Sequence, residues 1–337
     1  MDVLVATPTL WLAFAVFVTA ALAVDFLVMR HQGAHRISMR EAAIWSLVWV
    51  AVSFAFVAGM WWYLAAGGGA DARTLADAKA LEFITGYLIE KALAVDNIFV
   101  FLLVFTYFRI PAEFQKRVLM LGILGALVLR MLMILAGAWL TARFHWILYL
   151  FGAFLVYTGV RMWISSNDEP DLENNKLLQW LQRRLRVAPV FDGEQFVTVV
   201  DGVRMLTPLA LVILVLGVVD VVFAVDSIPA IFAITLDPFI VLTSNVFAVL
   251  GLRALYFLVA AMHERFHLLS YGLAIVLLLI GAKMLLMDVV HVPVAWSLAA
   301  TLAVLTGSVG LSLVIPPRGA GTGAYPFKAK APPPDDL

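Results

Sequence analysis

Residues 90–98 of this chain read EKALAVDNI, and residues 220–228 read DVVFAVDSI. Each stretch begins with an acid and carries a second acid six residues later, between Ala-Val and Asn-Ile or Ser-Ile. Both stretches lie in segments apolar enough for the middle of a lipid bilayer. Because an ionised carboxylate in hydrocarbon is costly, we interpret these four acids as functional. The rest of the chain is interpreted relative to them.

The composition indicates a polytopic membrane protein. Of the 337 residues, 63% are hydrophobic and 14% are charged, and the mean hydropathy is +0.98. A formal net charge of zero removes the electrostatic case for nucleic-acid binding. The chain has no cysteine, so disulfides and thiolate metal ligands are excluded. A metal site would therefore use oxygen or imidazole donors.

Stretches of about 20 mostly apolar residues are long enough to cross the hydrocarbon core of a membrane. We predict an all-α fold with nine transmembrane helices. They lie near residues 10–29, 41–64, 80–107, 117–141, 145–164, 205–234, 238–261, 267–287 and 294–315. No basic segment precedes the first stretch and no clear small-residue cleavage site follows it, which favours a retained helix over a signal peptide.

Two parts of the second half repeat parts of the first half. Residues 127–132 read LVLRML and residues 250–255 read LGLRAL, while 159–162 read GVRM and 281–284 read GAKM. The helices within 80–164 thus recur within 205–287. Because three helices separate the copies, the two copies cross the membrane in opposite directions. Such inverted repeats are typical of transporters that bind substrate near the midplane.

The repeats divide the chain into segments. Residues 1–79 hold the first two helices, 80–164 the first repeat, 165–204 a long loop, 205–287 the second repeat and 288–315 the last helix. Residues 316–337 form a tail rich in Pro, Gly and Ala that we expect to be disordered.

Lysine and arginine gather on one side of the predicted membrane. The loops after the first, third, fifth and seventh helices, together with the tail, hold sixteen of them: Arg30, Arg36, Arg40, Arg109, Lys116, Arg117, Arg161, Lys176, Arg183, Arg184, Arg186, Arg204, Arg265, Arg318, Lys328 and Lys330. The other side holds only Arg73, Lys79 and Arg143. By the positive-inside rule, the C terminus is predicted to be cytoplasmic and the N terminus outside.

The deeper charged residues have an excess of acids over bases. They are Asp25, Glu90, Asp96, Asp220 and Asp226 against Lys91, Arg130 and Arg253. A divalent cation would balance the two extra negative charges if all five acids are ionised. The alternative is that the acids only pair with the three bases as structural links between helices.

We expect the arginines to orient or neutralise the acids, since a guanidinium cannot bind a cation. For Lys91 we keep two interpretations, a proton-coupled role and pairing with an acid. For Asp25 the two interpretations are an interfacial role and a functional role. Glu82 and Lys283 lie near helix ends and are expected to reach the interface.

The repeated stretches supply an all-oxygen set of candidate metal ligands. They are the side chains of Glu90, Asp96, Asn97, Asp220, Asp226, Ser227 and Asn245, with the carbonyl of Val225. That carbonyl is expected to be free, because Pro229 has no N–H to donate to it. Such donors suit hard cations such as Mn²⁺, Mg²⁺ or Ca²⁺.

The spacing of the acids limits how they can share an ion. Residues six apart on a regular helix are about 9 Å apart along its axis and roughly 240° apart around it. Glu90 and Asp96 therefore cannot face one ion unless their helix breaks. Either the helix is broken or there are two sites.

A competing motif lies at residues 263–267, which read HERFH. It matches the His-Glu-x-x-His pattern, in which two imidazoles bind zinc and Glu264 would act as the base. The motif falls in a short basic loop with no third ligand nearby in sequence. We interpret it as a solvated turn.

The quoted stretches, together with residues 243–257 (TSNVFAVLGLRALYF) and 281–284, resemble the TerC family of bacterial integral membrane proteins, closest to its Alx-like branch. The similarity runs from about residue 10 to 315. The resemblance implies a plasma-membrane protein of metal-ion homeostasis, with Mn²⁺ export as the main role and tellurite resistance as a historical label. It also implies that Glu90, Asp96, Asp220 and Asp226 are the ion ligands.

We therefore expect a secondary transporter that exports a divalent cation, with Mn²⁺ as its substrate, no tightly bound cofactor and protons as the coupling ion. Its partners would be the lipid bilayer and the metal ion, and no enzymatic activity is expected. A second hypothesis is a membrane interaction protein that supplies metal to partners through residues 165–204. A remote third is an intramembrane zinc protease.

Overall fold

The computed structural model describes residues 7–32, 39–67, 71–108, 110–164, 185, 187–188, 192–193, 195–200, 202–260, 268–290 and 292–315. Within these ranges it leaves out the side chains of residues 24–32, 96, 99, 103, 106, 112, 113, 116 and 260. The predicted tail at 316–337, the 263–267 motif and most of the 165–204 loop lie outside the described residues.

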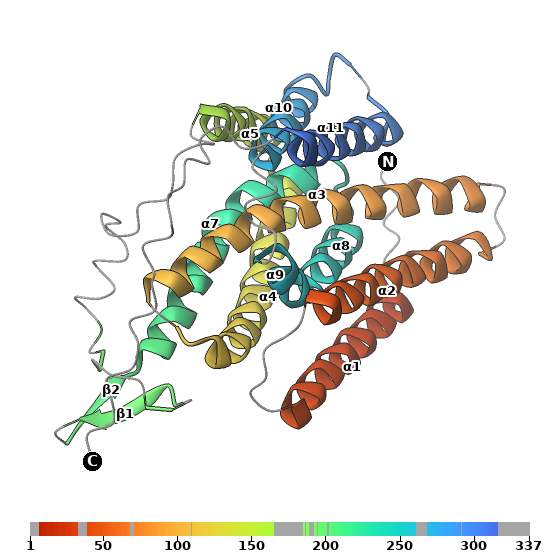
Figure 1. Cartoon of the computed structure of the whole chain (residues 1–337). Coiled ribbons are helices and arrows are strands. Elements are labelled where there is room, and N and C mark those ends of the chain that lie inside the picture. Colours follow the sequence, from red (N-terminus) through yellow and green to blue (C-terminus); the bar gives the residue numbers. More distant parts are fainter. Residues whose placement is uncertain are drawn as a thin grey trace.

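Ten helices and one β-hairpin make up the described chain (Figure 1). The helices are α1 (Pro8–Gln32), α2 (Met39–Ala65), α3 (Ala72–Tyr107), α4 (Ala112–Arg143), α5 (Ile147–Ile164), α7 (Pro208–Phe232), α8 (Pro238–Leu250), α9 (Leu252–Ala260), α10 (Leu269–Leu285) and α11 (Val294–Val314). The strands are β1 (Val197–Val200) and β2 (Val203–Leu206).

The helices confirm a polytopic membrane protein. Five described helices, α2, α4, α5, α7 and α11, are long and apolar enough to cross a membrane, and the bent pair α8 and α9 would make a sixth span. α1 and α10 contain shorter apolar stretches. α3 is long enough at 36 residues, but acids and lysines interrupt its apolar sequence. Large apolar side chains such as Leu47, Leu132 and Val222 are exposed, as expected for surfaces that face lipid.

The seventh predicted helix, residues 238–261, is wrong as a single element. α8 and α9 meet at Gly251 with a bend of 46°. The apolar sequence continues through the bend, so hydropathy gives no sign of it. A prediction from apolar length therefore joins the two helices.

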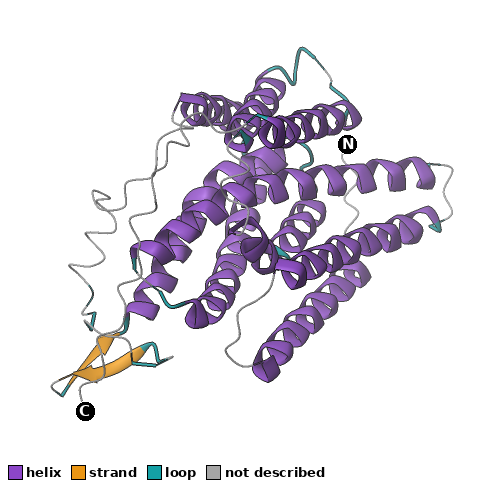
Figure 2. Ribbon diagram, in the orientation of Figure 1, coloured by secondary structure: helices purple, strands orange, loops and turns teal. Residues whose placement is uncertain are grey.

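A short β-hairpin lies at the end of the predicted 165–204 loop. β1 and β2 pair as an antiparallel hairpin just before α7 (Figure 2), so the predicted helix 205–234 begins a few residues too early. The hairpin turns at Gly202, which adopts a positive φ of 77° that favours glycine. α7 then starts with Thr207 as its N-cap and Pro208 in its first turn.

α8 lies at the centre of the bundle and is buried from Phe239 to Leu250. It packs along α3, while α1 and α2 supply aromatic rings to its outer face. Phe56 of α2 and Phe17 of α1 lie 4.6 Å and 5.1 Å from the ring of Phe247. At the other end of Figure 1, α5, α10 and α11 form a second packed group.

α5 and α10 cross through a pair of reciprocal glycine contacts. A Cβ on Gly281 would lie 2.8 Å from the carbonyl oxygen of Gly152 and 2.9 Å from Val156. A Cβ on Gly159 would lie 3.0 Å from the carbonyl oxygen of Ala274 and 2.9 Å from Leu278. The shift in sequence that carries Gly159 to Gly281 also carries Gly152 to Ala274 and Val156 to Leu278. The two contacts are therefore equivalent under the sequence repeat.

This crossing predicts a stability effect. Gly281→Ala should lower the melting temperature of the detergent-solubilised protein by several degrees, because overpacking of this kind costs about 1–3 kcal/mol. The matched control is Gly125→Ala in α4, where a Cβ meets nothing within 4 Å. That control should melt at the same temperature or slightly higher, since alanine is the better helix former. Equal melting temperatures for both variants would contradict the close crossing.

Candidate ion site between the repeats

Arg130 of α4 joins acids from both copies of the repeat. Its Nε donates to Asp220 Oδ2 of α7 at 3.0 Å, and its Nη2 donates to Asp220 Oδ1 at 2.9 Å. Its Nη1 makes an ion pair with Glu90 Oε1 of α3. The first acid of each repeated stretch is therefore held by the same guanidinium.

All three side chains of this triad, Glu90, Arg130 and Asp220, are removed from solvent. Glu90 is 0% exposed, Asp220 1% and Arg130 2%. Desolvating an ion costs several kcal/mol, so such charges persist only when they are paired with good geometry. The fork of donors on arginine suits this pairing, because it can hold one carboxylate with two nitrogens and reach a second acid with another. With both acids ionised, the triad carries one negative charge in excess.

Several neutral polar groups predicted as ligands are also buried. Asn245 of α8 is fully buried, and neither atom of its amide makes a hydrogen bond within the described part of the chain. The hydroxyl of Ser227 and the Glu90 Oε2 atom are likewise without a hydrogen bond there. Asn97 is buried in α3. Buried polar atoms are normally satisfied, so oxygen atoms left over in this way are candidates to bind water or an ion.

Asp226 lies on a different face of α7 from Asp220. Its Oδ1 accepts a hydrogen bond of 3.2 Å from Thr158 Oγ1 of α5, whereas Asp220 faces α4. The six-residue spacing therefore separates the two acids around the helix, as the spacing argument predicts. The neighbouring Val225 is 43% exposed, so its side chain points outward. The side chain of Asp96 lies outside the described residues.

The structure therefore brings together some of the predicted ligands and not others. Glu90 and Asp220 meet at Arg130, and Asp226 lies apart from them at α5. Among the described side chains, which do not include that of Asp96, no three acids or histidines are grouped as a metal centre. Arg130 has the neutralising role that we predicted for it, towards Glu90 and Asp220.

The break that would allow Glu90 and Asp96 to share an ion does not occur. α3 runs without interruption from Ala72 to Tyr107, and α7 continues as a helix through Pro229. The broken helix is instead α8–α9, where Lys91 of α3 donates to the carbonyl of Ala248 at 3.1 Å. Arg253, the repeat counterpart of Arg130, lies in α9 just beyond this break.

The turn between α7 and α8 forms a second polar cluster. Thr235 Oγ1 donates to Glu82 Oε2 at 2.6 Å, and Lys79 Nζ donates to the same oxygen at 2.9 Å. Asp237 caps α8 by accepting from Phe239 N at 3.0 Å and lies 3.8 Å from Lys79 Nζ. Glu82 is thus tied to the α7–α8 turn by Thr235 and to Lys79 one turn earlier in α3.

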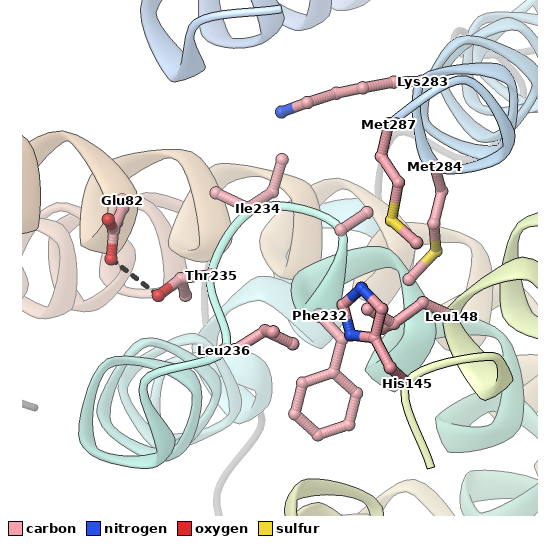
Figure 3. Close-up of a pocket in the computed structure, with 11 residues that line it drawn as sticks. Glu82, His145, Leu148, Phe232, Ile234, Thr235, Leu236, Lys283, Met284 and Met287 are labelled. Carbon is pink, nitrogen blue, oxygen red and sulfur yellow. Dashed lines mark hydrogen bonds between the residues drawn. The ribbon is translucent and has the colours of Figure 1, made fainter. Parts of the chain in front are cut away.

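A pocket of about 220 Å³ opens beside this turn (Figure 3). Glu82 and Thr235 line one side, and Lys283, Met284 and His145 line the other. The sequence contains one signal related to the pocket. Glu82, Gly86 and Glu90 follow one another at intervals of four residues, so they lie along one face of α3.

The chain is similar to several bacterial membrane proteins. Residues 75–319 match the family described as "Integral membrane protein TerC family". A protein of Escherichia coli (strain K12) named "Putative membrane-bound redox modulator Alx" is 53% identical over 301 residues, which cover 89% of this chain and 93% of that protein.

More distant relatives extend the comparison. An uncharacterized membrane protein of Myxococcus xanthus is 46% identical over 310 residues, covering 92% of this chain and 93% of its own length. One of Rickettsia felis is 35% identical over 304 residues, covering 90% and 97%. No solved structure matches the chain. The family match and the long alignments show that this chain belongs to the TerC family of integral membrane proteins.

Proposed function

We propose that this protein is a secondary transporter, and not an enzyme, that exports a divalent metal cation across the bacterial plasma membrane. The observation that carries the proposal is the buried contact of Glu90 and Asp220, one acid from each repeat, with the single cation Arg130. Intramembrane acids at the junction of two repeats are the usual place for an ion pathway. No tightly bound cofactor is required for this activity.

The proposal includes a topology of nine spans. The bent pair α8–α9 counts as one span, and α1, α3 and α10 cross the membrane with the five long apolar helices. α3–α5 and α7–α10 are then inverted repeats, with the N terminus outside and the C terminus in the cytoplasm. The equivalent glycine contacts between α5 and α10 support this symmetry.

The triad suggests how a cation could be bound and released. In the described state the guanidinium balances one of the two negative charges that the acids carry when both are ionised. If Arg130 moves away, Glu90 and Asp220 together balance one divalent cation. Protonation of the same acids would release the ion, because a carboxylate binds metal only when it is ionised. This exchange would couple metal export to protons, and the chain has no Walker A motif for ATP hydrolysis.

Mn²⁺ is the cation that we propose as substrate. Carboxylate, amide and hydroxyl oxygens favour hard divalent ions over copper or zinc. The choice of Mn²⁺ among those ions follows from the family resemblance. Asp226, near Thr158, would be a second point on the same pathway.

Asp226→Asn should abolish Mn²⁺ uptake into proteoliposomes under an imposed pH gradient. The substitution removes a charge but keeps an acceptor for Thr158, so the protein should remain folded. Asp71→Asn, which changes an exposed acid just before α3, is the control and should leave uptake unchanged. Uptake should be compared across Mn²⁺, Mg²⁺, Ca²⁺ and Zn²⁺. Full Mn²⁺ uptake by Asp226→Asn would overturn the assigned role of this acid.

Arg130→Gln should make the stability of the protein depend on metal. The variant leaves Glu90 and Asp220 buried without their cation, and removal of one partner from a buried pair costs about 3–5 kcal/mol. Mn²⁺ at 100 times its Kd would return about 2.7 kcal/mol. The melting temperature of the variant should therefore rise much more with Mn²⁺ than that of the unmodified protein. An equal rise in both proteins would argue against a metal site at these acids.

A second candidate function is an interaction protein at the membrane. The observation that favours it is the hairpin, whose Val197, Val199 and Val203 are exposed beyond the helical bundle (Figure 2). The relatives named as redox modulators would fit such a role through partners. This chain has no cysteine and so cannot perform thiol redox chemistry itself.

A substitution in the hairpin distinguishes the two candidate functions. Val199, at 62% exposed, can be changed to Lys with little effect on folding. If the protein acts through partners, Val199→Lys should abolish cellular metal tolerance while proteoliposome uptake stays normal. If it acts as a transporter, both should remain within about twofold of the unmodified protein.

A further inference from the structure

At the bend between α8 and α9, a side chain from another helix contacts the backbone. In a continuous helix the carbonyl of Ala248 would accept the N–H of Leu252. Here it accepts Lys91 Nζ from α3 at 3.1 Å, and the N–H of Gly251 bonds instead to the carbonyl of Val249. The lysine thus takes the place of a backbone donor at the point where the helix breaks.

Gly251 is needed at the bend because a side chain would not fit there, and not because of its backbone angles. Its φ of −82° is open to any residue. A Cβ at this position, however, would lie 2.5 Å from Lys91 Nζ and 3.1 Å from the Cβ of Trp49. Trp49 of α2 and Lys91 of α3 therefore close on the break from two sides.

The first repeat provides an internal comparison. Val128 occupies in α4 the position that Gly251 occupies in the second repeat, and α4 runs unbroken through it. Val128 is 54% exposed, so it is not packed against neighbouring helices as Gly251 is packed against Lys91 and Trp49. Two similar sequences therefore adopt different backbone conformations. The second repeat differs in having Gly251 at the bend, which leaves space for Lys91.

We propose that Lys91 is a positioning residue that holds α8–α9 bent, so that its removal lets the helix straighten. Without a donor from α3, the Ala248 carbonyl would be left unsatisfied in the bundle. Closing the helix would satisfy it with Leu252 N–H, which is the favoured outcome away from water. The bend sets the direction of α9, and with it the position of Arg253, two residues beyond Gly251.

The consequence for transport depends on the proposed function. The two repeats differ in this state, because α4 is continuous at Arg130 whereas α8–α9 is bent just before Arg253. Loss of the Lys91 contact would straighten α8–α9 and move α9 relative to the first repeat. Movement of one repeat against the other is the change expected when a transporter built from inverted repeats switches sides. The hinge itself can be tested without transport, so failure of one proposal is distinguishable from failure of the other.

The test combines a distance with a double-mutant cycle. The chain has no cysteine, so spin labels can be placed at Leu236→Cys and Leu258→Cys alone. Straightening the 46° bend should lengthen the distance between them by roughly 2–3 Å, from a rise of about 1.5 Å per residue. Lys91→Met should show this longer distance, and Lys91→Arg, which keeps the donors, should not.

The cycle measures melting temperatures. Gly251→Ala should lower the melting temperature by several degrees, since its methyl group meets Lys91. The double variant Gly251→Ala with Lys91→Met should show a decrease in melting temperature much smaller than the sum of the decreases in the two single variants. Gly217→Ala, where a Cβ meets nothing within 4 Å, is the control and should combine additively with Lys91→Met.

Two results would overturn the proposal: an unchanged label distance in Lys91→Met, or additive losses for Lys91→Met with Gly251→Ala. If Lys91→Met does not survive purification, Lys91→Leu provides the same test. Leucine has no donor for the Ala248 carbonyl, so the longer distance is again expected.

Discussion

The structure depends on one buried cation that satisfies two buried acids. Arg130 holds Asp220 through its Nε and Nη2 atoms and pairs with Glu90, so the three residues tie α3, α4 and α7 together. Charges without water are tolerated only when each has its partner, so these three helices cannot separate without leaving an ion exposed to an apolar surrounding. The same constraint gives the site its proposed chemistry, because any cation that binds the acids must compete with the guanidinium.

The rest of the bundle accommodates this constraint. α8 is covered by aromatic rings from α1 and α2 and packs along α3, which leaves its polar residues facing inward. α5 and α10 meet through glycines and pack closely, and Thr158 of α5 reaches Asp226. The second polar cluster, at Glu82 and Thr235, ties the α7–α8 turn to α3. The contacts of Arg130, Asp226 and Glu82 thus each link two or more segments of the bundle.

The two copies of the repeat are similar in sequence and different in shape. α4 is continuous, while α8–α9 bends where Lys91 meets the Ala248 carbonyl. A broken helix in a membrane needs donors and acceptors from its neighbours, because water is not available to supply them. Here the neighbouring helix α3 supplies a side-chain donor, Lys91. This lysine follows Glu90, the acid of α3 that pairs with Arg130.

Much of the architecture follows from the sequence alone. Apolar length predicts the helices, because a span must satisfy its own backbone. The repeated acids indicate the candidate site, because a buried charge is costly. The spacing of Asp220 and Asp226 correctly predicts that they face different sides. Only the tertiary structure decided which acid pairs with Arg130, since that depends on how α3, α4 and α7 pack. It also decided that the helix breaks at Gly251 and not between Glu90 and Asp96. The break lies where a lysine reaches across from another helix, and the hydropathy of a sequence carries no record of such a contact.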